Sequence, residues 1–280
     1  MRIGLHVSIS GGIEKTPLTA MKLGCECFQM FARPPQGGFI TVMSEEKTQE
    51  FRDNLKKSGI NNFYIHAPYF INFASIDNRI FYGGIKAIRE DLELGSALGA
   101  KYLMTHLGSA KEREEKDAIK KVAEGIEKVL DEYKGTTKLL IENSAGAGKI
   151  MGDAFEEINA IIKKVKNKDL AGICFDTAHA FESGYDFRTP ESAESVFENI
   201  EETIGINAIK LIHINESMTD LGSHKDRHAN IGKGKIGESF FRRLMRDERF
   251  KDIDCILETP VEGEEEDMRK MKEYRIINSK

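Results

Sequence analysis

The chain has 280 residues, which suits one large α/β domain or two small ones and permits a substantial buried core. Hydrophobic residues at 40% and charged residues at 31% are typical of a soluble globular protein. No apolar run reaches the ~18 residues of a membrane span, and Met1-Arg2 leads into a strand-like segment without a signal peptide, so we expect a cytoplasmic protein without a membrane partner. The net charge of −5 argues at first against nucleic acid as a partner.

Short apolar runs rich in β-branched residues recur along the chain, and each is followed by a charged stretch with helical periodicity. The runs predicted as strands are IGLHV (3–7), CFQMF (27–31), FYIHA (63–67), YLMTH (102–106), KLLIE (138–142), GICFD (172–176), IKLIH (209–213) and CILET (255–259). The clearest helical stretches cover residues 45–59, 83–100, 120–135 and 152–166. Gly59, Gly99 and Gly135 fall near the ends of three of them, where a helix C-cap favours a left-handed residue.

Eight strand–helix units predict a (β/α)₈ TIM barrel. A doubly wound open sheet also alternates strands with helices and is the alternative fold. Eight strands are the number that closes a barrel, and no linker of low complexity divides the chain. We therefore expect a single TIM-barrel domain over residues 1–280.

From the third strand onward, six successive predicted strands end in or beside a histidine or a carboxylate. The C-terminal ends of barrel strands converge on one face, where active sites are built. A single histidine at such a position is more often a core residue, but clustered carboxylates would repel one another without a metal. Imidazole and carboxylate groups are good ligands for divalent ions. The six residues are His66, His106, Glu142, Asp176, His213 and Glu258.

Three of the seven histidines fall within residues 213–228, and three further candidate ligands extend the predicted site. His179 follows Asp176 closely and is displaced along the loop, whereas Asp226 and His228 come from the loop after the seventh strand. Three ligands with an open position are the usual form of a catalytic zinc site. The other six residues can hold two more ions if one carboxylate bridges.

The remaining histidines and the cysteines give weaker signals. His6 ends the first strand, where it is equally consistent with support of a ligand and with plain structure; His224 is expected in an exposed loop or near phosphate. The cysteines lack the spacing of a disulfide framework or a zinc ribbon, so we expect reduced core thiols at Cys25, Cys27, Cys174 and Cys255.

Over nearly its full length the sequence resembles the endonuclease IV family of apurinic/apyrimidinic (AP) endonucleases. Three signatures carry the resemblance: HAPYFIN (66–72), GICFDTAHAF (172–181) with GYDFRTP (184–190), and HINESMTDLGSHKDRH (213–228). The segments IENSAG (141–146), IGKGKIG (231–237) and ILETP (256–260) add to it.

The resemblance implies three Zn²⁺ ions per chain, with manganese or iron as partial substitutes. One ion would be held by His66, His106 and Glu142. Glu142 would bridge to a second ion, completed by Asp176, His213 and Glu258. The third would be held by His179, Asp226 and His228. Glu142 and Glu258 are the expected catalytic residues, the latter also as a group that orients the nucleophile.

The implied reaction is hydrolysis of the phosphodiester 5′ to an abasic site in duplex DNA, leaving a 3′-hydroxyl, with trimming of blocked 3′ ends as a related activity. Three Zn²⁺ ions would offset the negative net charge and attract phosphate. A sugar isomerase or epimerase of the related barrel type is the main alternative. A non-catalytic, metal-stabilised DNA-binding module is a second alternative. We expect a monomer.

The loops expected to contact DNA depart from the family pattern, because RPPQGGF (33–39) stands where the family usually has Asn-Pro-Arg and an aromatic residue. Gln36 falls about where an arginine commonly enters the DNA stack. We therefore expect Tyr69 and Phe70, just after His66, to enter the stack, unless they are core residues of their loop. The basic residues expected beside the metal face as DNA contacts are Lys225, Arg227 and Lys233, with Lys235 as a neighbour.

Overall fold

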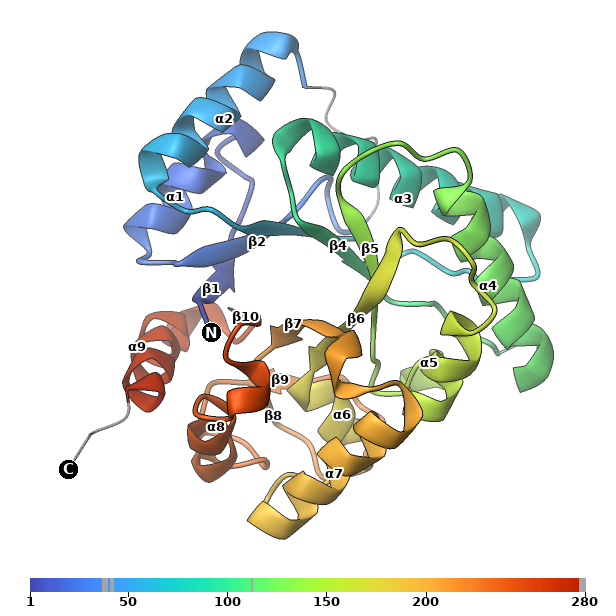
Figure 1. Ribbon diagram of the computed structural model, residues 1–280, viewed down its shortest axis with the longest axis vertical. Helices are drawn as coiled ribbons and strands as arrows, with labels where there is room; N and C mark the ends of the chain where they lie inside the picture. Colours follow the sequence, from blue (N-terminus) through green and yellow to red (C-terminus); the bar gives the residue numbers. More distant parts are fainter. Residues whose placement is uncertain (37–39, 41–42, 112, 277–280) are drawn as a thin grey trace.

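The computed structural model describes residues 1–36, 40, 43–111 and 113–276 and is a closed barrel of eight parallel strands ringed by helices (Figure 1). The strands are hydrogen-bonded in the order β1-β10-β7-β6-β5-β4-β3-β2. Closure confirms the predicted TIM barrel and excludes the open doubly wound sheet. The barrel strands are β1 (Ile3–His6), β2 (Cys27–Phe31), β3 (Phe63–His66), β4 (Tyr102–Thr105), β5 (Lys138–Glu142), β6 (Leu170–Asp176), β7 (Ile209–His213) and β10 (Asp254–Leu257).

All eight predicted strands form where the apolar runs lie. The register pairs β1 with both β2 and β10, so the first and last strands lie side by side and the barrel has no open edge. A separate two-stranded sheet of β8 (Glu216–Ser217) and β9 (His228–Ala229) follows β7 and was not expected.

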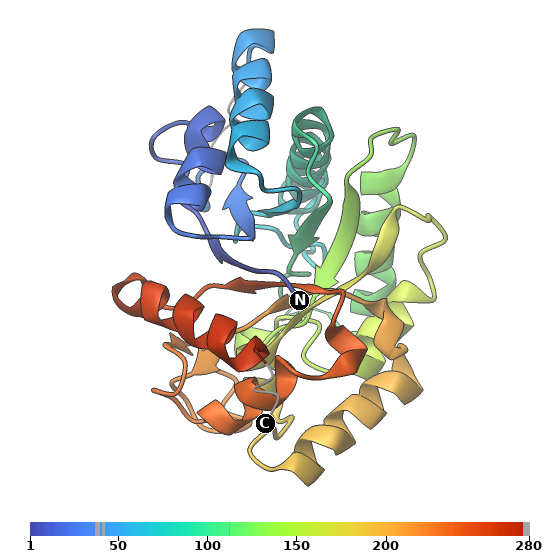
Figure 2. The same cartoon turned by 60° about the vertical axis from the view of Figure 1, so that its left-hand side comes forward.

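The helices cover the outside of the strands, and Figure 2 shows the same ring from a second direction. They are α1 (Thr16–Lys22), α2 (Glu45–Ser58), α3 (Asn78–Leu98), α4 (Glu115–Leu130), α5 (Phe155–Ile162), α6 (Thr177–Ser183), α7 (Pro190–Thr203), α8 (Glu238–Leu244) and α9 (Glu264–Arg275). Short 3₁₀ turns are η1 (Ile13–Lys15), η2 (Ala147–Lys149), η3 (Ile206–Ala208), η4 (Glu248–Phe250) and η5 (Val261–Gly263).

Two of the three expected glycine caps are present. Gly59 ends α2 with φ 71° and Gly99 ends α3 with φ 94°, both in the left-handed region. The expectation for Gly135 is wrong, because α4 ends at Leu130 with an extended residue at its C-cap. At Gly135 a Cβ would lie 2.3 Å from the Tyr133 hydroxyl oxygen, so close packing, not capping, requires glycine there.

The barrel interior has an apolar layer between a small polar cluster at its N-terminal end and a polar C-terminal end. Its apolar layer consists of Cys27, Tyr64, Met104, Leu140, Cys174, Leu211 and Ile256. Below this layer the Tyr64 hydroxyl donates to Asp254, which also accepts from Asn62 and Arg2. All four cysteines are free and buried, as expected. The apolar layer leaves the C-terminal end as the place for polar chemistry.

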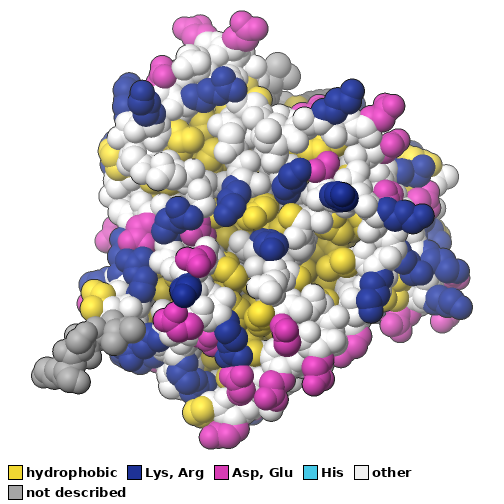
Figure 3. Space-filling view, in the orientation of Figure 1, with side chains coloured by type: hydrophobic (Ala, Val, Ile, Leu, Met, Phe, Trp, Pro, Cys, Tyr) yellow, Lys and Arg dark blue, Asp and Glu magenta, His cyan; other side chains and the backbone are white. Residues whose placement is uncertain are grey.

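The outer surface carries charges of both signs. In the view of Figure 3, lysine and arginine side chains are interspersed with aspartate and glutamate, and no histidine is visible on that face. Among the described residues, no helix has the length and hydropathy needed to cross a lipid bilayer.

The contact between β1 and β2 depends on Gly4. A Cβ at this position would lie 1.8 Å from the backbone oxygen of Cys27, which cannot move away without breaking strand pairing. We predict that Gly4→Ala lowers the free energy of unfolding by about 3 kcal/mol or more, measured by chemical denaturation. Gly83→Ala in α3, where nothing lies within 4 Å, is the control and should stabilise by about 0.5 kcal/mol. Equal effects of the two variants would contradict the steric argument.

Candidate metal centre

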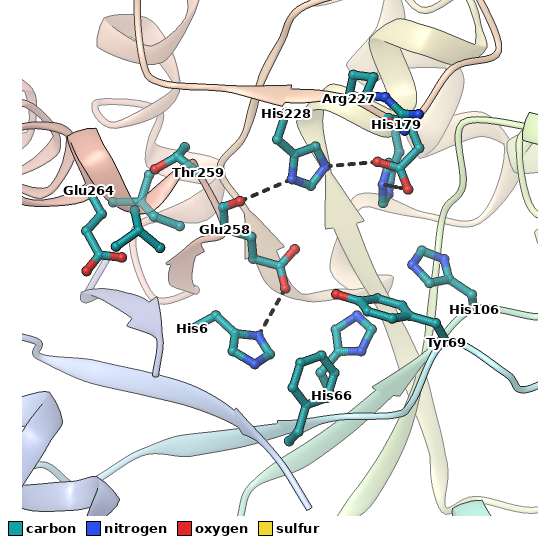
Figure 4. Close-up of a pocket in the computed structure, with 14 residues that line it drawn as sticks. His6, His66, Tyr69, His106, His179, Arg227, His228, Glu258, Thr259 and Glu264 are labelled. Carbon is teal, nitrogen blue, oxygen red and sulfur yellow. Dashed lines mark hydrogen bonds and ion pairs between the residues drawn. The ribbon is translucent and has the colours of Figure 1, made fainter. Parts of the chain in front are cut away.

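The nine expected ligands lie together at the C-terminal end of the barrel. Strands β3, β5, β6 and β7 end in ligands, and two more ligands directly follow β4 and β10. The last three are His179 in α6, Asp226 in the segment before β9, and His228, the first residue of β9. Figure 4 shows the histidines of this site turned toward a common cavity. The cavity has a volume of about 440 Å³.

The first group of side chains consists of His66, His106 and Glu142. The Nε2 atom of His66 lies 3.1 Å from Oε2 of Glu142, and Nε2 of His106 lies 3.6 Å from the same oxygen. One potential ligand atom from each residue falls within 4.8 Å of the others. This is the first set expected from the sequence.

The second group consists of Glu142, Asp176, His213 and Glu258, again within 4.8 Å of one another. His213 is its centre: Nδ1 lies 3.0 Å from Oε1 of Glu142 and 3.2 Å from Oε2 of Glu258. Glu142 therefore turns one oxygen toward the first group and the other toward the second. That arrangement is the geometry a bridging carboxylate requires.

The third group consists of Asp176, His179 and His228, and the expected ligand Asp226 lies beside it. Asp226 lies on the open side of this group, with its side chain 54% exposed. Its two oxygens contact the imidazoles separately, at 3.5 Å from Nε2 of His179 and 3.6 Å from Nε2 of His228. The structure also corrects the setting of His179, which lies in helix α6 and not in a loop.

Opposite charges hold these groups together. Burial opposes ionisation of Glu142, but the imidazoles of His106 and His213 outweigh it and hold the pKa of that carboxyl well below its usual range. Burial likewise opposes protonation of His179, but Asp176 and Asp226 hold the pKa of that imidazole well above its usual range. The buried carboxylates thus need positive charge beside them, which protonated imidazoles or divalent ions can supply.

The distances fit metal ligands better than hydrogen bonds alone. The buried Nε2 atom of His228 has no hydrogen-bond partner within the described part of the chain, although carboxylate oxygens lie 3.6 Å and 3.9 Å away. Two tetrahedral ligands of zinc, each about 2.1 Å from the ion, are about 3.4 Å apart. The residues present therefore fit divalent ions.

Sequence reasoning missed Gln29, a fully buried residue of β2. Its Oε1 accepts a hydrogen bond from Nε2 of His213 at 2.8 Å, while its Nε2 donates to Oε1 of Glu258 at 2.6 Å. The amide thus leaves Nδ1 of His213 free to face the carboxylates and orients two candidate ligands at once. The available signal was a lone polar residue within the apolar run CFQMF.

Two buried asparagines were also missed. The side chain of Asn143 accepts from the backbone N–H of Asp176 at 2.7 Å, and Nδ2 of Asn215 donates to Oδ2 of Asp176 at 2.6 Å. Oδ1 of Asn215 accepts from the backbone N–H of Glu258 at 2.9 Å. Asn143 and Asn215 follow the candidate ligands Glu142 and His213 by one and two residues, in IENS and HINE. The sequence therefore placed them near the site but did not indicate their hydrogen-bond partners.

Tyr69 and Phe70 lie at the mouth of the site, and the structure excludes the core role for Tyr69. Tyr69 is 66% exposed and Phe70 40% exposed. In Figure 4 the Tyr69 hydroxyl points into the cavity toward Glu258. The ring meets Phe31 edge-on at 5.6 Å, and the Tyr69 N–H donates to the Pro35 carbonyl at 3.2 Å.

A second cavity, also of about 440 Å³, adjoins the first. Tyr69, His106, His179 and Asp226 line both cavities, whereas Phe70 lines only the second. The two aromatic side chains therefore lie where a bound molecule would approach the candidate metal-binding residues.

The basic candidates are exposed, and their placement differs. Arg227 lines the cavity, and Lys225 precedes Asp226 on the same segment. Lys233 is exposed, and the neighbouring Lys235 forms an ion pair with Asp220 at 3.4 Å. Gln36 is exposed, while Gly37 to Phe39 of the divergent loop lie outside the described residues.

The two histidines left open by the sequence now have clear settings. His6 lies beside the site, with Nδ1 2.9 Å from Nε2 of Gln29 and 3.4 Å from Oε1 of Glu258. His224 has a half-exposed side chain, as expected for a loop residue, and its Nδ1 lies 3.1 Å from the Ala145 carbonyl oxygen.

Comparison with known proteins agrees with the resemblance seen in the sequence. The family described as xylose isomerase-like TIM barrel matches residues 18–274. A probable endonuclease 4 from Halothermothrix orenii is 36% identical, over 93% of this chain and 94% of its own length. A probable endonuclease 4 from Nitrosopumilus maritimus is also 36% identical, over 98% of this chain and 100% of its own.

Solved structures point the same way. Endonuclease IV from Thermus thermophilus superposes with a TM-score of 0.86 at 32% identity, covering 98% of both chains. A D-tagatose 3-epimerase-like protein superposes with a TM-score of 0.73 at 19% identity, covering 98% of this chain and 97% of its own, which shows a shared fold alone. With its barrel, its clustered ligands and relatives of this identity over nearly the whole chain, the protein belongs to the endonuclease IV family.

Proposed function

We propose that this protein is a zinc-dependent AP endonuclease that hydrolyses the phosphodiester 5′ to an abasic site in duplex DNA and leaves a 3′-hydroxyl, with trimming of blocked 3′ ends as a related activity. The observation that carries the proposal is the convergence of eight imidazole and carboxylate side chains into three adjoining groups that share Glu142 and Asp176, with Asp226 beside the third group. The relatives named as endonucleases support the nuclease assignment.

In this proposal the three groups hold three zinc ions, and the protein works as a monomer. Mixed imidazole and carboxylate donors favour zinc, with manganese or iron as partial substitutes. When bound, such ions activate water as a nucleophile and neutralise the charge that develops on phosphate oxygens. Glu142 would be the bridging ligand, because one of its oxygens faces the first group and the other faces the second.

In this proposal, side chains of the protein orient the nucleophile and the DNA backbone. Glu258 lies in the cavity wall with its carboxylate fixed by Gln29 and, at 3.4 Å, by Asn215, so it is suited to orient a nucleophile beside the second group. Arg227 at the cavity rim adds a positive charge for the DNA backbone, and Lys225 and Lys233 extend that surface. Gln36 supplies no guanidinium from its loop.

Access to a buried centre requires the abasic nucleotide to leave the duplex. Flipping costs a few kcal/mol and is cheapest where no base is stacked or paired. Tyr69 and Phe70 are exposed aromatic groups at the cavity mouth and are suited to fill the gap in the stack. The Pro35–Tyr69 backbone contact holds this aromatic pair in place.

A sugar isomerase or epimerase remains the second candidate because of the fold shared with the epimerase-like protein. A sugar isomerase or epimerase needs metal ligands for only one or two ions. The third group of side chains would have no role in such an enzyme. Incision of an abasic-site duplex, measured beside epimerisation of ketoses, separates the two functions.

Metal content tests the assignment of three ions to the three groups. We predict close to three tightly bound divalent ions per chain after zinc reconstitution, measured by elemental analysis of purified protein. A content of one ion or none per chain after reconstitution would contradict the proposal of three ions.

The bridging role of Glu142 gives a second prediction. Glu142→Gln removes the charge and one of the two anionic oxygens that face the first and second groups. Single-turnover cleavage of an abasic duplex should fall by orders of magnitude while circular dichroism shows a folded barrel. Glu157→Gln, a partly buried carboxyl of α5 outside the site, is the control and should cleave normally. Activity of Glu142→Gln within a few-fold of wild type would show that the bridge is not needed.

The aromatic pair gives a third prediction. Base–aromatic stacking is worth about 1–3 kcal/mol, so Tyr69→Ala/Phe70→Ala should weaken abasic-duplex binding by about tenfold or more in a fluorescence titration. Metal content and cleavage of a small phosphodiester should stay nearly unchanged. Tyr82→Ala removes an aromatic group of similar exposure from α3, away from both cavities, and should leave binding intact. Parallel loss of duplex binding and small-substrate cleavage would argue against a wedge.

A further inference from the structure

Glu182 is a buried carboxylate of α6 that none of the three ligand groups uses. Its Oε1 accepts hydrogen bonds from the Ser217 hydroxyl at 2.7 Å, the Thr219 hydroxyl at 3.2 Å and the Arg227 backbone N–H at 3.2 Å. Its Oε2 is buried and has no hydrogen-bond partner within the described part of the chain. Burial of a carboxylate against neutral donors alone is costly, so the arrangement calls for an explanation.

All three donors belong to the segment that carries Asp226 and His228. The Arg227 N–H is part of the peptide bond that joins Asp226 to Arg227. Glu182 therefore binds the backbone between the two candidate ligands Asp226 and His228. The Arg227 carbonyl accepts from the Met218 N–H at 2.9 Å on the opposite side. The backbone carbonyl of Glu182 also accepts from the His224 N–H at 2.9 Å.

The same helix supplies His179, three residues before Glu182. In the third group His179 therefore comes from α6 and His228 from the 217–228 segment, and Glu182 joins these two elements. Besides the Glu182 side chain, the segment is held by backbone hydrogen bonds to α6, from Gly222 to Phe181 and from His224 to Glu182. Its regular pairing is limited to the two-residue strands β8 and β9, and the Asp226 side chain is 54% exposed. Segments with exposed backbone and few buried contacts open easily.

We propose that Glu182 is the positioning residue of the third metal group: by holding the Asp226–Arg227 peptide against α6 before any ion binds, it sets the affinity of that group for its ion. The inference rests on the proposed three-ion function. Preorganised ligands lose less conformational freedom on binding, so the third ion binds more tightly while Glu182 is in place. The two groups that share Glu142 are built on other elements, so we expect their two ions to be retained.

The first test measures the positioning directly and needs no metal. Amide hydrogen exchange of residues 217–229 in metal-free protein is compared between wild type, Glu182→Ala and Glu182→Gln. Glu182→Ala should raise exchange at this segment at least tenfold, whereas Glu182→Gln keeps an Oε1 acceptor and should stay close to wild type.

Glu157→Ala is the matched control, because the Glu157 carboxylate in α5 accepts from the Gly152 N–H in the same manner. It should leave exchange at residues 217–229 unchanged. Unchanged exchange in this segment for Glu182→Ala would overturn the proposal, as would equal acceleration in the Glu157→Ala control.

The second test measures zinc binding by chelator competition and elemental analysis. Glu182→Ala should retain two ions and bind the third at least tenfold more weakly than wild type, and Glu182→Gln should restore wild-type affinity. Three ions of unchanged affinity in Glu182→Ala would overturn the inference while leaving the proposed function intact. Fewer than three ions in the wild-type protein would instead refute the proposed three-ion function, and hydrogen exchange would then decide the role of Glu182 alone.

Discussion

The carboxylate of Glu142 is the interaction on which the rest of the site depends. It is completely buried at the end of β5 and is surrounded by the imidazoles of His66, His106, His179 and His213. A charge in such surroundings is stable only with opposite charge in contact, because the interior solvates it poorly. Imidazoles from several strand ends supply that complement in contact with Glu142, which explains why histidines gather there in a chain that has only seven.

The barrel can hold these polar side chains because its interior combines an apolar layer with a polar C-terminal end. The apolar layer of Cys27, Leu140 and their neighbours supports the strands from within, so the strand ends can carry polar groups without weakening the centre. Buried amides then fix the polar groups: Gln29 orients His213 and Glu258, and Asn143 and Asn215 hold Asp176. These side chains make the site stiff before it meets a ligand.

The sequence predicted much of this, for identifiable reasons. Eight apolar runs marked eight strands because buried parallel strands need continuous hydrophobic residues. His66 or Glu142 stood out because a polar residue at the end of such a run needs a partner. Gln29 escaped notice because an amide is not a typical metal ligand and its partners come from strands far away in sequence. The sharing of Asp176 between the second and third groups likewise depends on the path of the chain in space, which periodicity does not encode.

Sharing of carboxylates has a consequence for how the groups respond to one another. Glu142 belongs to the first and second groups, and Asp176 to the second and third, so no group is electrostatically independent. In the proposed centre, an ion bound in one group would change the affinity of the next group for its ion, and by thermodynamic reciprocity the factor would be the same in both directions. In the proposed three-ion centre, loading would be a linked equilibrium along a row of ions. The half-exposed end at Asp226 would be the end from which that row exchanges with solvent.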